Sequence, residues 1–181
     1  MDDVAAGMID SARALADFDH ARDDFEQAFS QVPPEGLDYK PEGDDYSVRD
    51  LLAHIAGSMN QYSAVLDQMK EAEFREVRMA SLGSDVPVEP PSSDPGPTEQ
   101  DVESNPEAGM FKEMELAHDT LAAKIRDLEA HEYSLEAPVF YPGAEEAYPT
   151  KASDIVGWVT DHYNEHTVQV LQMLEQWKSK Q

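Results

Sequence analysis

Apolar side chains recur at steps of three and four residues along four stretches of the chain, the spacing of amphipathic helices. This pattern predicts helices over residues 2–30, 47–82, 106–129 and 150–177, the second of them with a break. No convincing strand pattern and no internal repeat accompany them. The sequence therefore predicts an all-α protein, an antiparallel four-helix bundle that forms a single domain over residues 1–181.

Two connections between the predicted helices differ in character. Residues 83–107 hold six of the twelve prolines, seven acidic side chains and no Lys or Arg, so they cannot continue a helix and have little apolar surface to bury. This acidic Pro-rich loop is long for a connection inside a compact domain, which favours a disordered linker over a lid. Residues 133–149 are rich in aromatic residues and proline, and are predicted to form an ordered loop, with a short extended piece, over one end of the bundle.

Three histidines fall on the apolar stripes of the predicted helices. His162 and His166 are four residues apart and lie one above the other on the fourth helix, while His54 lies on the second. A ring nitrogen that faces a core must be hydrogen-bonded or must bind a metal. Because side chains from facing helices converge in a bundle core, the three rings are candidate ligands of one metal ion. The alternative is that these are core histidines whose ring nitrogens are hydrogen-bonded within the protein or half exposed to solvent.

The remaining histidines and the nearby aromatic residues are interpreted as structural. Trp158, one turn before His162, and Tyr62 are interpreted as core filling rather than as a platform for substrate. The histidines assigned to structural or solvated positions are His20, His118 and His131.

The charge of the chain narrows the classes of partner. The sequence contains 38 Asp and Glu against 13 Lys and Arg, a formal net charge of −25. Nucleic acid and anionic membranes bind basic surfaces, so both are excluded as partners. No apolar run approaches the roughly 20 residues of a membrane span, and the acidic N-terminus lacks the features of a signal peptide. We therefore expect a cytoplasmic protein.

The chain contains no cysteine, which excludes thiolate ligands and cysteine nucleophiles. Three imidazoles suit zinc or nickel and leave a coordination position open to water or substrate. The motifs of serine hydrolases, phosphate-binding loops and His-Glu-x-x-His metalloproteases are missing, and so are the Glu-x-x-His repeats of dimetal bundles. No catalytic side chain can therefore be assigned beyond the candidate ligands.

Two segments resemble motifs of a known family. The segment from Asp45 to His54 resembles the aromatic-Ser-x-x-acid-x-x-x-His entry to the second helix of DinB-like (YfiT-like) proteins, with Tyr46 where the family usually has Trp. His162-x-x-x-His166-x-x-Gln169 resembles their fourth-helix motif. The resemblance covers nearly the whole chain, although the acidic insertion is longer than the family pattern leads us to expect. It implies a four-helix bundle with a divalent metal held by the three histidines, often in a homodimer.

The same resemblance implies a class of function. Characterised members include thiol S-transferases that use bacillithiol or mycothiol, a mycothiol-dependent isomerase and metal-dependent hydrolases. We therefore expect a metal-dependent thiol S-transferase or hydrolase that acts on a small molecule. Because the chain has no cysteine, any thiol must be a low-molecular-weight cosubstrate. The alternative is a non-catalytic binding or stress-response module whose metal is structural or absent.

Overall fold

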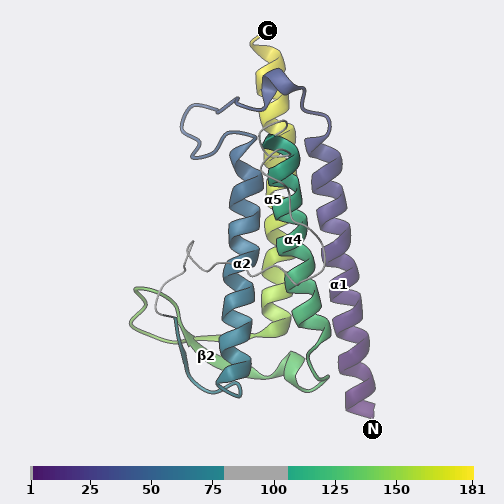
Figure 1. Ribbon diagram of the computed structural model, residues 1–181, viewed down its shortest axis with the longest axis vertical. Coiled ribbons are helices and arrows are strands. Elements are labelled where there is room, and N and C mark those ends of the chain that lie inside the picture. The colour runs from purple at the N-terminus through teal and green to yellow at the C-terminus, as the bar shows by residue number, and fades with distance from the viewer. Residues whose placement is uncertain (1, 80–105) are drawn as a thin grey trace.

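The computed structural model describes residues 2–79 and 106–181. The prediction of a disordered or lid-like loop over residues 83–107 lies outside the described residues, except that its last two residues begin a helix. Four α-helices lie within the described residues and pack as the predicted bundle (Figure 1). They are α1 (Asp2–Phe29), α2 (Asp50–Glu71), α4 (Pro106–Arg126) and α5 (Ala152–Ser179).

The directions of the helices differ from the antiparallel arrangement that we expected. In Figure 1, α1 and α5 run upward while α2 and α4 run downward. Two ion pairs confirm the parallel course of α2 and α4, because Asp67 pairs with Lys124 and Lys70 pairs with Asp127 three residues further along each helix. Parallel neighbours in a bundle need a long crossover connection, which accounts for the length of the chain between them.

A small sheet at one end of the bundle was not predicted. Strand β2 (Glu136–Phe140) lies between β1 (Val77–Arg78), with which it is parallel, and β3 (Tyr148–Lys151), with which it is antiparallel. Strand β1 has only two residues, and the pairing of β2 with β3 contains two opposed prolines, which are unusual in strands, so no strand signal stands out in the sequence. The expected ordered loop with an extended piece over residues 133–149 is therefore a β-hairpin.

The second helix also ends earlier than predicted, at Glu71 rather than Leu82. Glu73 and Phe74 have positive φ angles of 51° and 55°, a left-handed conformation that cannot continue a helix. The amide of Phe74 donates to the Met69 carbonyl oxygen at 2.7 Å, and the Phe74 ring is buried. Burial of this ring offsets the cost of the unusual backbone and directs the chain into β1.

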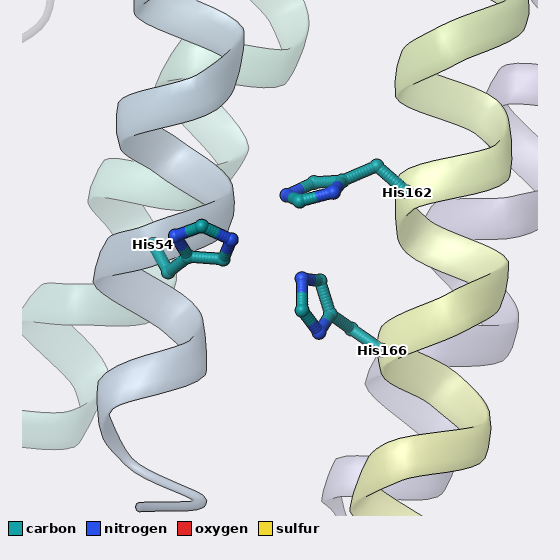
Figure 2. Close-up of side chains that lie close together, drawn as sticks. All are labelled: His54, His162 and His166. Atoms are coloured by element: carbon teal, nitrogen blue, oxygen red, sulfur yellow. The ribbon is translucent and has the colours of Figure 1, made fainter. Parts of the chain in front are cut away.

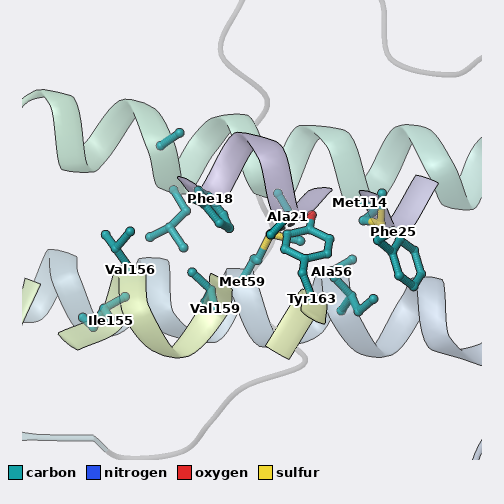
Figure 3. Packing of buried hydrophobic residues seen from close by; sticks show 14 of the residues in the cluster. Phe18, Ala21, Phe25, Ala56, Met59, Met114, Ile155, Val156, Val159 and Tyr163 are labelled. Atoms are coloured by element: carbon teal, nitrogen blue, oxygen red, sulfur yellow. Dashed lines mark hydrogen bonds between the residues drawn. The ribbon is translucent and has the colours of Figure 1, made fainter. Parts of the chain in front are cut away.

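The core lies between all four helices, and aromatic rings from α1 and α5 meet there (Figure 3). The Tyr163 ring is fully buried, with its centroid 5.8 Å from that of Phe18 and 5.9 Å from that of Phe25. The inward row of α5 thus contains Val159, Tyr163 and Val170, one position away from the predicted row through His162. His162 lies instead at the edge of the core, where α5 faces α2.

His118 of α4 lies in this core and is not part of the cluster formed by His54, His162 and His166. Its ring stacks on Phe18 at 3.9 Å, its Nε2 lies 2.9 Å from Asp19 Oδ1, and its Nδ1 lies 3.4 Å from the Tyr163 hydroxyl. Burial lowers the pKa of His118, although the Asp19 carboxylate opposes that shift. His20 and His131 are exposed, as expected for solvated positions.

Candidate metal centre

A hydrogen-bonded turn sets the start of α2 and with it the position of His54. The Ser47 amide donates to the Asp50 carboxylate at 3.0 Å, and the Asp50 amide donates to Ser47 Oγ at 3.2 Å. This is a capping box with the shorter acid in place of Glu. These bonds lower the pKa of Asp50, so the box is formed over the neutral pH range. His54 then lies one turn into α2, on the side that faces α5.

The structure brings the three predicted ligands together between α2 and α5 (Figure 2). One potential ligand nitrogen from each of His54, His162 and His166 lies within 4.8 Å of the others. The ring centroid of His54 lies 4.9 Å from that of His162 and 5.0 Å from that of His166, and the His162 and His166 centroids are 4.4 Å apart. Two zinc–nitrogen bonds of about 2 Å place their nitrogens no more than about 4 Å apart, so small rotations of the rings toward one another bring all three within reach of one ion. The cluster can therefore hold a metal ion.

Gln169 fixes the tautomer of His166. The side-chain amide nitrogen of Gln169 donates to the Asp44 carboxylate, at 3.0 and 3.2 Å from its two oxygens, which orients the amide oxygen toward His166. That oxygen lies 2.7 Å from His166 Nδ1 and can only accept, so Nδ1 carries the proton. In the neutral ring, which is the form that binds metals, the Nε2 atom is then left with a lone pair. It is also buried and has no hydrogen-bond partner among the described residues.

An unpartnered buried nitrogen beside two further imidazoles is the feature that best fits a metal ligand. A buried acceptor without a partner costs about 1–3 kcal/mol, and coordination to a cation removes that cost. Among the described residues, no carboxylate and no fourth histidine join this group of ligand atoms. The candidate donor set is therefore three imidazoles, with no fourth ligand from the described residues.

The other two rings are held by neighbours from α2 and from the loop before it. The ring of Tyr46 lies against that of His54, with centroids 4.4 Å apart. Ser58 Oγ lies 3.2 Å from His162 Nε2 and 3.0 Å from the His54 carbonyl oxygen. A hydroxyl has one proton, so Ser58 can keep its bond to the carbonyl when His162 uses its lone pair elsewhere. Both rings are only partly buried, which leaves the site open to solvent on their side.

The electrostatics of the cluster favour uncharged rings. Burial lowers the pKa of His162 to about 4, and the neighbouring His166 and His54 rings add to that shift. Burial, followed by proximity to His166, also lowers the pKa of His54. Neutral imidazole is the form that binds metals, so both rings are ready to coordinate at neutral pH.

The lowered pKa of His162 predicts a pH-dependent difference in stability. The unfolded chain gains a proton at this residue near pH 6.5, and the folded metal-free chain only near pH 4, so acidification through that window favours unfolding. Relative to a His162→Gln variant, the metal-free parent should lose free energy of unfolding as the pH falls from about 6.5 to 4. Urea unfolding of both proteins after chelation measures this difference. A difference that does not change with pH contradicts the assignment.

The hydrogen bonds that link Asp44 to Gln169 and Gln169 to His166 predict that substitutions along them lower metal affinity by different amounts. Gln169→Leu removes the acceptor that sets the His166 tautomer, and loss of such a partner typically weakens metal binding about 10- to 100-fold. Asp44→Ala should have a smaller effect in the same direction, because it acts through Gln169. Zinc affinity measured by competition with a chelating dye tests both. Asp45→Ala, the same change at an exposed neighbour, is the control and should leave the affinity unchanged.

Sequence reasoning identified the three histidines that converge and missed part of their support. Gln169 was noticed only as part of a motif, and Asp44 carried no signal because it is one acid among many in an acidic loop. The contact between Gln169 and Asp44 joins residues 125 positions apart, so no local pattern could reveal it.

Comparisons with known proteins are consistent with this picture. A family model described as the DinB superfamily matches residues 17–170, a span that includes all three histidines. No curated protein and no solved structure matches the chain. None of the helices in the described residues combines the length and apolar composition needed to cross a membrane.

Proposed function

The chain belongs to the DinB superfamily, and we propose that it is a metal-dependent enzyme that transfers a low-molecular-weight thiol to an electrophile or hydrolyses a small substrate. His54, His162 and His166 would hold the ion, zinc or nickel. The observation that carries this proposal is the buried Nε2 atom of His166, which has no hydrogen-bond partner in the part of the chain that the structure describes and lies beside two further imidazoles. A buried nitrogen lone pair in this position is suited to bind a cation.

The character of the ligands supports catalysis more than a purely structural role. Structural zinc sites are typically closed by four protein ligands, whereas catalytic sites have three and leave a position for water or substrate. Three ligands converge in the described residues, and two of them, His54 and His162, are partly exposed. These features favour an enzyme over a module whose metal only supports the fold.

Three neutral ligands also determine which substrates the site attracts. When bound, a divalent ion in such a site lowers the pKa of a thiol or of water and so supplies a nucleophile at neutral pH. The chain contributes no compensating carboxylate to the ligand set in the described residues, so the full charge of the ion acts on an incoming anion. Tyr46 and Ser58 restrict the rings of His54 and His162 and keep the ligand nitrogens convergent. The thiol itself must come from solution, because the chain has no cysteine.

The proposal is tested by a screen of thiols with electrophiles and of small esters and amides, using zinc- or nickel-loaded protein. We expect consumption of at least one pair or substrate above the uncatalysed rate, with loss of that activity in His162→Ala and after chelation. His131→Ala, which changes an exposed histidine, is the matched control and should retain full activity. Activity that is equal in the parent and in His162→Ala would contradict the mechanism even if the metal is bound.

A further inference from the structure

Three aromatic side chains gather beside the metal centre, on the side away from Gln169. The Trp158 ring of α5 has its centroid 5.7 Å from that of Tyr62 on α2 and 5.9 Å from that of Tyr148 on β3. Trp158 lies one helical turn before His162, and Tyr62 lies one turn after Ser58, which contacts His162. We refer to Tyr62, Tyr148 and Trp158 as the aromatic cluster.

The exposure of the aromatic cluster is more than core filling requires. Trp158 and Tyr62 pack against the core but are only partly buried, and the Tyr148 side chain is one of the most exposed large apolar groups in the described residues at 55%. The hairpin is already anchored by the fully buried Ala137 and Val139 of β2. The outer ring surfaces are therefore available for a ligand, in contrast to the interpretation of Tyr62 and Trp158 as core filling alone.

The arrangement defines two features of a matching ligand. The ion held by the three histidines would attract an anionic oxygen or sulfur, since its ligands carry no charge. The aromatic cluster, whose Trp158 lies one turn of α5 before His162, presents ring surfaces that favour stacked or edge-to-face contact with a planar ring. A single small molecule with an anionic group two to four bonds from an aromatic ring could meet both.

We propose that the aromatic cluster is a substrate subsite that binds a planar aromatic group while the anionic group of the same molecule reaches the metal. This inference rests on the metal site of the proposed function, but not on turnover. It assigns Trp158 and Tyr148 as residues that determine specificity. It also narrows the substrate class to arylalkyl thiols, carboxylates and similar small aromatic anions.

The test compares the binding of three carboxylates to zinc-loaded protein by calorimetry. We expect 3-phenylpropionate to bind about tenfold more tightly than hexanoate, a flexible apolar acid of similar reach, because a favourable ring contact adds to the burial of apolar area. Acetate should bind weakly at the metal alone. Trp158→Leu and Tyr148→Ala should each reduce the preference for the aromatic acid to about twofold or less, without changing zinc content or acetate affinity. Tyr148 is exposed, so its replacement leaves the fold intact.

Trp177→Leu is the matched control, because this second tryptophan lies near Gly36 at the other end of α5 and should leave the preference unchanged. Equal affinities for the aromatic and the aliphatic acid, or an aromatic preference that survives both cluster variants, would overturn the subsite. Failure of all three acids to bind zinc-loaded protein would overturn it as well. A preference that depends on the cluster, found in a protein that turns over no substrate, would support the subsite and count against the proposed enzyme.

Discussion

Replacing His166 with alanine is expected to abolish stable metal binding, with zinc affinity falling by more than about a hundredfold. Loss of a residue that only orients a metal ligand lowers metal affinity about 10- to 100-fold. His166→Ala removes a ligand itself, and with it the contact to Gln169, so the loss of affinity should be larger. The His166 ring is the most buried of the three and presents the unpartnered Nε2. Equilibrium dialysis against zinc, with folding checked by circular dichroism, measures the effect.

The control for this experiment is His20→Ala. His20 is a helical histidine whose side chain is 76% exposed and whose Nε2 lies 3.6 Å from Asp24 Oδ2. Its replacement removes an imidazole without touching the cluster, so zinc affinity should stay within about twofold of the parent. If His166→Ala binds zinc as tightly as His20→Ala, the cluster is not the metal site.

Phe18→Ala is expected to destabilise the protein by about 3–5 kcal/mol, the usual cost of removing a buried aromatic side chain. Phe18 is 1% exposed, stacks on His118 and lies against Tyr163, so its removal leaves a cavity where α1, α4 and α5 meet. The free energy of unfolding in urea measures the loss. The same experiment on Val168→Ala, at a position that is 54% exposed, should show a change within about 0.5 kcal/mol.

A loss below about 1 kcal/mol for Phe18→Ala would show that the three helices do not pack around this ring. It would also show that the core does not fix the rotation of α5 about its axis. His162 directly precedes Tyr163 in the sequence, so the burial of Tyr163 fixes the rotation of α5 that directs His162 toward α2.

The sequence was informative wherever the signal was local. Helical periodicity located the four helices, because each buries an apolar stripe that recurs every three to four residues. The capping box at Ser47 and Asp50 is likewise a local feature, since its two partners are three residues apart. The pairing of His162 with His166 also follows from spacing on one helix. The convergence of His54 with that pair depended on the assumption of a bundle.

Features that depend on distant contacts could not be read from local patterns. The row through Tyr163, rather than the row through His162, faces the core, because the rotation of α5 is set by rings on α1 and α4. The parallel course of α2 and α4 depends on a connection whose composition does not encode direction. The two-residue strand β1 is stabilised by its pairing with β2, about 60 residues later, and has no period of its own.

The measurement that tests the central claim most directly is X-ray absorption at the zinc edge of the zinc-loaded parent protein. We expect one zinc per chain, with three imidazole nitrogens at about 2.0–2.1 Å and an oxygen ligand from solvent completing the shell. The signal of one imidazole should disappear in a His54→Ala sample that is forced to bind zinc at high concentration. A parent protein that binds no zinc, or a shell with fewer than two imidazoles, would contradict the three-histidine metal centre.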